Sequence, residues 1–286
     1  MGDFVTLHEV GPRDGLQNEA RIIPVTQKVA LIDTLAASGL KHIEIGSFVS
    51  PKWVPQMADT AEVLGKVAPA AVEFAVLVPN MRGWEAFLAA RRPDVAYQVA
   101  VFISASEGFS HSNLNCSIVE SIARLAPVLE AARADGVATR GYVSCVSDCP
   151  FDGPTDPAQV ADTVAKLRDL GPMPISLGDT LGRATPDRIA AMLDAVLEVA
   201  PAAALAGHYH DTGGRALANI RVSLEHGLRA FDSAVGGLGG CPYAPNAPGN
   251  VATEAVLSML TADGYETGVD AAIIAKAAQM AKEMRQ

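Results

Sequence analysis

The sequence predicts a closed (β/α)8 barrel, the TIM-barrel fold, with one additional C-terminal helix. Three observations predict it. Short apolar segments alternate with longer amphipathic segments along all 286 residues. Each strand–helix pair takes about thirty-odd residues, the size of one βαβ unit. Eight such pairs follow one another without a linker or a change in composition. We therefore expect one barrel rather than a doubly wound open sheet, its structural rival.

Eight segments have the composition of buried strands. They are rich in Val, Ile and aromatic residues and are bounded by Gly, Pro, Asp or Ser, which is typical of strands. The expected strands are 4–10, 42–47, 72–78, 95–103, 139–144, 175–177, 203–210 and 231–235.

The segments between them have apolar residues at helical spacing. Asp156 and Thr185 each precede a proline, which predicts an N-cap followed by a first helical residue. The expected helices are 26–37, 55–67, 80–90, 117–134, 157–170, 187–199, 213–226, 251–261 and 270–284. We expect residues 1–286 to form a single domain, with the loop and helices of about 236–286 decorating the barrel.

Composition excludes several classes of protein. Hydrophobic residues make up 49% of the chain, which is too many for a disordered protein, yet no apolar run reaches the length of a membrane helix. The net charge is −10 and the basic residues are dispersed, which argues against nucleic-acid binding. The four cysteines form no CxxC pair and favour a reducing compartment. With no leader in view, we expect a cytoplasmic protein.

Polar residues stand at the C-terminal ends of the expected strands, where barrel enzymes place their chemistry. His208 and His210 are the most informative. Residues two apart on a strand point to the same face, so both imidazoles face the interior, while Leu205 and Tyr209 face the helices. A lone buried histidine is usually a core residue, but two side by side at a strand end favour a metal site over that reading.

Asp14 follows the first expected strand, which lies two strands away from the seventh in a closed barrel. It can therefore reach the same ion as His208 and His210. Two imidazoles, one carboxylate and water form a mixed nitrogen and oxygen site. Mg²⁺ or Mn²⁺ fits this donor set, and Zn²⁺, Co²⁺ and Fe²⁺ remain alternatives.

Three further charged residues stand at strand ends. Arg13 precedes Asp14, and its fork of donors suits a developing oxyanion, although a solvated charge or ion pair is the simpler reading. Glu44 and Asp179 need partners inside a barrel. They fit a role orienting the metal ligands, bound water or Arg13, or a structural ion pair.

A glycine-rich segment, 236–250, follows the eighth expected strand and predicts a mobile loop over the barrel mouth. Cys241 stands at its tip, where a metal and Arg13 would lower the pKa of the thiol and suit it to proton transfer. Asn250 precedes the next helix, so it is either an N-cap or a fourth metal ligand through its amide oxygen.

These stretches resemble the 3-hydroxy-3-methylglutaryl-CoA lyase family. The matching motifs are GPRDGLQNE at 11–19, FVSPKWVPQMAD at 48–59, NCS at 115–117, GYVSC at 141–145, SLGDT at 176–180, the paired histidines and GGLGGCPYA at 236–244. The resemblance spans essentially the whole chain. The loop that carries Cys241 is its specific part, because the histidine pair and Arg13-Asp14 fit a wider set of barrel lyases and condensing enzymes.

The resemblance implies retro-Claisen cleavage of 3-hydroxy-3-methylglutaryl-CoA to acetyl-CoA and acetoacetate, as in leucine degradation and ketone body formation. It implies an acyl-CoA substrate and an oligomer, a dimer or larger. The implied ligands of Mg²⁺ or Mn²⁺ are Asp14, His208, His210 and Asn250. Arg13, Cys241, Glu44 and Asp179 are the implied catalytic residues, with Arg13 on the enolate and Cys241 as acid or base. We also expect Gln17, Ser144 and Asn113 to bind substrate.

Three alternatives remain open from the sequence. One is a lyase for a longer branched 3-hydroxyglutaryl-CoA. A second is a condensing enzyme or aldolase on the same barrel, which the Cys241 loop disfavours. The third is a non-catalytic metal-binding or CoA-binding module. A further hypothesis concerns His208, which can relay protons only if its second ring nitrogen is free.

Overall fold

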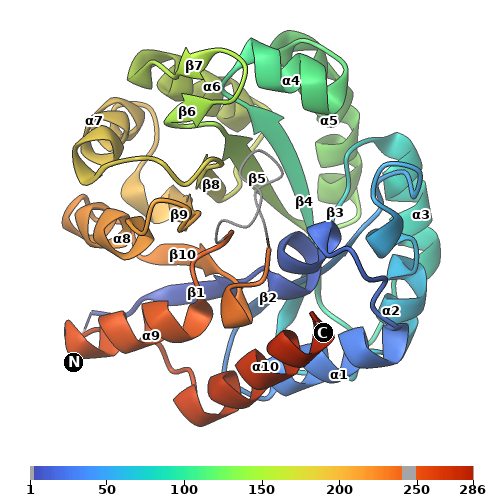
Figure 1. Cartoon of the computed structure of the whole chain (residues 1–286). Coiled ribbons are helices and arrows are strands. Elements are labelled where there is room, and N and C mark those ends of the chain that lie inside the picture. The colour runs from blue at the N-terminus through green and yellow to red at the C-terminus, as the bar shows by residue number, and fades with distance from the viewer. Residues whose placement is uncertain (1–2, 240–248, 286) are drawn as a thin grey trace.

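The computed structural model describes residues 3–239 and 249–285. Its centre is a closed barrel of eight parallel strands in the order β1-β10-β9-β8-β5-β4-β3-β2, surrounded by helices (Figure 1). The strands are β1 (Thr6–Glu9), β2 (His42–Ser47), β3 (Glu73–Leu77), β4 (Tyr97–Ser104), β5 (Ala138–Ser144), β8 (Ile175–Asp179), β9 (Leu205–Tyr209) and β10 (Ala230–Ser233). Since β1 pairs with both β2 and β10, the ring is closed. The predicted barrel is confirmed, and the open sheet is excluded.

Each strand is followed by a helix that covers the outside of the barrel. These helices are α1 (Val25–Ala36), α2 (Thr60–Lys66), α3 (Met81–Ala90), α5 (Ile118–Ala134), α6 (Pro157–Asp169), α7 (Pro186–Leu197), α8 (Ala216–Glu225) and α9 (Thr253–Ala262). Asp156 and Thr185 cap α6 and α7 with their side chains, as predicted. The additional helix, α10 (Ala271–Met284), lies outside the barrel beside α1 and α9 (Figure 1).

A helix and a hairpin of two short strands were not predicted, and both extend the loops at the carboxyl ends of strands. Helix α4 (Glu107–Leu114) follows β4. It is polar and weakly amphipathic, but Ser106 caps it by accepting a hydrogen bond from the Phe109 amide. A hairpin of β6 (Asp148–Cys149) and β7 (Gly153–Pro154) follows β5. Neither has the hydrophobic period by which a helix or strand is recognised in a sequence.

The two faces of β9 separate the core from the barrel interior. Tyr209 points outward, and its hydroxyl lies 2.7 Å from the Ser223 hydroxyl on α8, as the alternation predicts. Leu205 also joins the apolar layer between strands and helices. The neighbouring His208 faces the interior. No helix in the described part of the chain combines the length and apolar character that a membrane crossing requires.

Candidate active site at the barrel mouth

The chain after β1 winds into a single π-helical turn, Gly11–Gly15, instead of an open loop. The buried carboxylate of Glu9 holds this turn in place. It accepts hydrogen bonds from the backbone amides of Gly11 and Val235, at 2.8 and 2.9 Å, and from the Thr253 hydroxyl at 2.6 Å. Burial raises the pKa of Glu9 to about 7, against the pull of these three donors. Glu9 thus ties the first turn to the loop after β10 and to the start of α9.

The π-helical turn brings Asp14 to the histidine pair of β9. One ligand atom from each of Asp14, His208 and His210 lies within 4.8 Å of the others. The distance between Oδ2 of Asp14 and Nε2 of His208 is 4.0 Å. The sequence predicted this convergence from the two-strand separation of β1 and β9 in a closed barrel, and the strand order gives that separation.

Three donors fix the carboxylate of Asp14. Its Oδ1 accepts from Nη1 of Arg13 and from Nε2 of Gln17, both at 2.8 Å, and its Oδ2 accepts from Nδ2 of Asn250 at 2.7 Å. Burial alone would raise the pKa of Asp14, but Arg13 and His208 outweigh it and hold that pKa at about 2. The carboxylate is therefore charged at neutral pH.

Asn250 lies at the site and is not an N-cap. The residue before α9 is Ala252, so the N-cap reading is wrong. Asn250 instead forms a β-bridge with His210 and contacts Asp14 through its amide nitrogen. A metal-ligand role needs the amide oxygen to turn toward the cluster. That role stays a prediction, although the residue is in position for it.

His208 is fixed by Asp232, a residue that the sequence did not single out. Nδ1 of His208 lies 3.0 Å from Oδ2 of Asp232 on the adjacent strand β10. Burial lowers the pKa of His208, but the hydrogen bond and the charge of Asp232 raise it by more than burial lowers it. The pKa of His208 is therefore raised overall. The second ring nitrogen is thus occupied, which contradicts its use as a proton relay. An acidic residue within the apolar strand 231–235 was the available signal.

His210 is neutral, and one of its ring nitrogens has no hydrogen-bond partner among the residues that the structure describes. Burial, reinforced by the charge of His208, lowers the pKa of His210 to about 4. Within residues 3–239 and 249–285, its Nδ1 is buried without a hydrogen-bond partner. A neutral imidazole beside an ionised carboxylate is the state in which a metal ion can be bound.

Arg13 and Glu44 form an ion pair beside the cluster of Asp14 and the two histidines. Nη2 of Arg13 lies 2.7 Å from Oε2 of Glu44, and the Tyr142 hydroxyl donates to the same oxygen at 3.3 Å. Burial raises the pKa of Glu44, and Arg13 opposes that shift. Among the described residues, Nε of Arg13 and Oε1 of Glu44 are also buried without a partner. The guanidinium is therefore fixed by two carboxylates, those of Asp14 and Glu44.

The other predicted site residues lie in different surroundings. Asp179 is fully buried and accepts from the Ser147 hydroxyl at 2.6 Å and the Ala184 amide at 3.0 Å, so it joins the loops after β5 and β8. Ser144 is half-buried at the end of β5, and Asn113 is exposed on α4. Their roles stay predictions. Cys241 lies outside the residues that the structure describes.

The donor set at the mouth fits a divalent cation in an open site better than it fits a structural metal site in which protein ligands fill every position. It combines one ionised carboxylate with two imidazoles, and within the described part of the chain a buried nitrogen of His210 has no hydrogen-bond partner. The set contains no thiolate among the described residues. Such a mixed site leaves positions for water or an oxygen-rich ligand.

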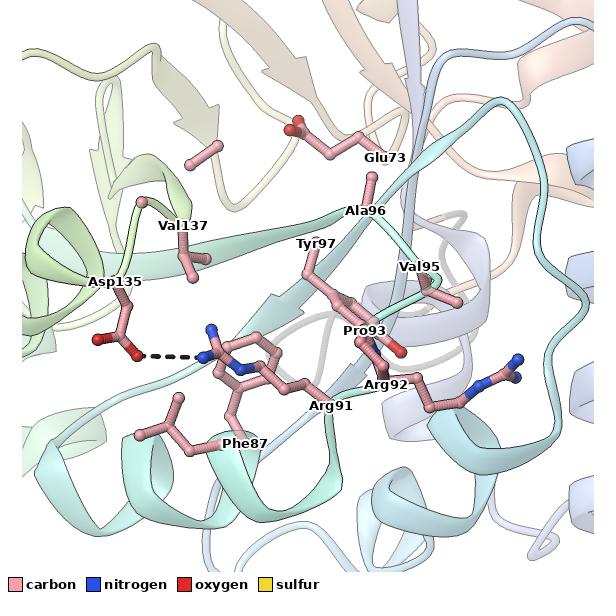
Figure 2. Close-up of a pocket in the computed structure, with 13 residues that line it drawn as sticks. Glu73, Phe87, Arg91, Arg92, Pro93, Val95, Ala96, Tyr97, Asp135 and Val137 are labelled. Atoms are coloured by element: carbon pink, nitrogen blue, oxygen red, sulfur yellow. Dashed lines mark hydrogen bonds and ion pairs between the residues drawn. The ribbon is translucent and has the colours of Figure 1, made fainter.

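A separate hollow of about 530 Å³ opens at the other end of the barrel. It lies between the end of α3, the start of β4 and the turn before β5, and it contains Arg91, Arg92 and Tyr97 (Figure 2). Arg91 forms an ion pair with Asp135 at 3.2 Å across it. Tyr97 is the first residue of β4, so this hollow is remote from the strand ends that carry Asp14 and the histidines.

A closed β/α barrel with converging carboxylate, imidazole and guanidinium groups at the carboxyl ends of its strands has the arrangement of a barrel enzyme with its active site at this end. The chain belongs to the HMGL-like family, whose model matches residues 5–281.

Relatives with functional names share most of the chain. The 3-hydroxy-3-isohexenylglutaryl-CoA/hydroxy-methylglutaryl-CoA lyase of Pseudomonas aeruginosa is 52% identical over 96% of this chain and 91% of its own length. The solved HMG-CoA lyase of Brucella melitensis is 58% identical, covers 99% of both chains and has a TM-score of 0.97. An HMG-CoA lyase of Acinetobacter baumannii, solved with coenzyme A and 3-methylmalate, is 32% identical over 99% of this chain and 92% of its own, with a TM-score of 0.92.

Proposed function

We propose that this chain is a divalent-metal-dependent carbon–carbon lyase that cleaves (S)-3-hydroxy-3-methylglutaryl-CoA to acetyl-CoA and acetoacetate. The observation that carries the proposal is the convergence of Asp14, His208 and His210 beside Arg13. Relatives with 52% and 58% sequence identity are named hydroxymethylglutaryl-CoA lyases, which supports this choice of substrate. The coenzyme A bound to the Acinetobacter enzyme supports an acyl-CoA ligand for this family.

Asp14, His208 and His210 would hold the cation, with Asn250 as the fourth ligand after its amide turns. Mg²⁺ or Mn²⁺ suits these ligands and the remaining water positions. When bound, the cation supplies a Lewis acid for the tertiary hydroxyl and carboxylate of the substrate. The ionised state of Asp14 and the neutral state of His210 prepare the site for it.

Arg13 stabilises the charge that develops on the thioester oxygen when the carbon–carbon bond breaks. The leaving fragment is the enolate of acetyl-CoA, and a fixed guanidinium is the group that best complements it. Asp14 and Glu44 hold Arg13 from two sides, so the guanidinium needs no reorganisation during the reaction. Glu44 therefore acts on the reaction through Arg13.

The tertiary hydroxyl must lose a proton as the carbon–carbon bond breaks, and the enolate carbon must gain one, so the reaction is balanced in protons. In the proposed assignment, Cys241 gives its proton to the enolate carbon and solvent water takes up the hydroxyl proton. In the opposite assignment, which stays open, Cys241 is the base that takes the hydroxyl proton. His208 does not relay these protons, because Asp232 occupies its other nitrogen. Asp179 supports the loops around the site, and Gln17, Ser144 and Asn113 are the proposed substrate contacts. An oligomer stays a prediction.

Product analysis tests this function. The protein is incubated with 3-hydroxy-3-methylglutaryl-CoA and Mg²⁺ or Mn²⁺, and acetyl-CoA and acetoacetate are measured with and without a chelator. We expect equal amounts of both products, lost on chelation and restored by added metal. Turnover that resists complete metal removal, or products other than these two, would contradict the proposal.

A second candidate is a lyase that also accepts a longer branched acyl chain. The name of the Pseudomonas aeruginosa relative, which includes the isohexenyl substrate at 52% identity, specifically favours it. The same assay with 3-hydroxy-3-isohexenylglutaryl-CoA compares the two substrates. A kcat/KM within tenfold of that for the methyl substrate would establish dual specificity.

A further inference from the structure

A buried polar network runs from the candidate metal site into the interior of the barrel, and Asp232 is its centre. Asp232 is 2% exposed. Its Oδ1 accepts from Nη2 of Arg140 at 2.6 Å, and its Oδ2 accepts from the Ser176 hydroxyl at 2.6 Å and faces Nδ1 of His208 at 3.0 Å. These partners come from β5, β8 and β9, so three strands hold one carboxylate of β10.

Arg140 keeps this carboxylate charged and fixed. It is itself 2% exposed, and its other terminal nitrogen, Nη1, donates to Nδ1 of His8 on β1 at 2.8 Å. Its guanidinium also lies 5.1 Å from the centroid of the Tyr142 ring. A buried arginine held in this way cannot move to another acceptor, so Asp232 retains an ionised oxygen for His208.

We propose that Asp232, held by Arg140 and Ser176, is the positioning residue that presents Nε2 of His208 to the cation. A carboxylate accepts hydrogen bonds only, so Nδ1 of His208 must carry the ring proton. The lone pair then lies on Nε2, the nitrogen that is 4.0 Å from Oδ2 of Asp14. A carboxylate behind a metal-binding histidine sets both its tautomer and its orientation.

The proposal predicts a specific failure for Asp232→Asn. The amide has the shape of the carboxylate but carries donors as well as an acceptor. Because Arg140 can only donate, the amide oxygen must face Arg140 and the NH₂ group must face His208. Nδ1 then becomes the acceptor, and the ring proton moves to Nε2, where the metal has to bind.

Metal affinity is the primary test, and the inference rests on the proposed metal site. Mn²⁺ is titrated into the full chain, and free Mn²⁺ is followed by its paramagnetic resonance signal. We expect Asp232→Asn to bind Mn²⁺ about 10- to 100-fold more weakly than the wild type. The matched control is Ser223→Ala, which loses a buried hydrogen bond to Tyr209 on the opposite face of β9 and should bind Mn²⁺ as the wild type does.

The outcomes separate this inference from the proposed function. Wild type that binds no Mn²⁺ contradicts the metal site and with it the positioning role. Wild type that binds Mn²⁺, with Asp232→Asn equally tight, overturns the positioning role alone. Equal weakening in Ser223→Ala also overturns it, because the effect would then reflect any lost buried hydrogen bond.

A second measurement does not depend on whether Asp232→Asn folds. The wild type is labelled with ¹⁵N-histidine, and the His208 signals are assigned by their loss in His208→Gln. At a pH where the ring is neutral and without metal, we expect the proton on Nδ1. A proton on Nε2 would overturn the proposal.

Discussion

The two ends of the barrel contain similar residue types in different arrangements. At the carboxyl ends of the strands, Asp14, His208 and His210 converge within 4.8 Å. At the amino ends, the hollow of about 530 Å³ has charged groups that pair with one another, as Arg91 does with Asp135 (Figure 2). The hollow has the volume for a small molecule, whereas at the mouth the nitrogen and oxygen atoms of three side chains lie close to one another. We therefore place the proposed chemistry at the mouth because of the convergence of donors there, and not because of the volume of a hollow.

The largest expected effect separates the two ends directly. His208→Ala or Asp14→Ala removes a proposed metal ligand and should lower kcat by more than about 1,000-fold, because both the Lewis acid and the substrate orientation are lost. The measurement is turnover of 3-hydroxy-3-methylglutaryl-CoA at saturating Mg²⁺. Arg91→Ala, at the opposite end, is the control and should stay within about twofold. A comparable loss in Arg91→Ala would mean that the two ends are not functionally distinct.

Arg13→Lys should have the next largest effect. Lysine keeps the charge but cannot contact Asp14 and Glu44 at once while facing an enolate. We expect kcat to fall about 100- to 1,000-fold, the typical loss for one oxyanion-stabilising donor. Mn²⁺ affinity should change far less than kcat. Normal turnover would show that a diffuse positive charge suffices at the mouth.

Glu9→Gln tests whether Glu9 stabilises the structure around the site, as distinct from taking part in the reaction. Burial raises the pKa of Glu9 from 4.5 to about 7, so the folded state binds this proton more firmly than the unfolded state. Its stabilising effect is full below pH 4.5 and is lost as pH rises through about 7. Urea unfolding at pH 5 and pH 8 should show the wild type losing about 2.5 kcal/mol more than Glu9→Gln. Parallel losses in the two proteins would contradict the assignment.

Tyr209→Phe should have the smallest effect and tests the outer face of β9. It deletes the hydrogen bond to Ser223, so the free energy of unfolding should fall by about 1 kcal/mol. Turnover and metal affinity should match the wild type, because Tyr209 faces α8 and not the mouth. A large loss of kcat would show that the two faces of this strand are coupled.

The sequence predicted the barrel and the convergence of Asp14 with the histidines because both follow from local periods. A two-residue period puts His208 and His210 on one face, and eight repeated units place β1 two strands from β9. The partners of these proposed ligands depend on the register between strands that are distant in sequence. Asp232 meets His208 through the pairing of β10 with β9, and Arg140 reaches Asp232 across the barrel. Neither contact has a local signature.

Several interactions at the mouth join residues from opposite parts of the polypeptide. Thr253 meets Glu9 across 244 positions, and Asn250 meets Asp14 across 236. During synthesis, Glu9 and Asp14 therefore leave the ribosome long before Thr253 and Asn250 have been made. The proposed metal ligands and the residues that support them can come together only when nearly the whole chain has emerged, which makes closure of the barrel a late, non-local folding event. A nascent or truncated chain that stops before Asn250 would have all eight barrel strands, but it would lack the contact of Asn250 with Asp14 and that of Thr253 with Glu9.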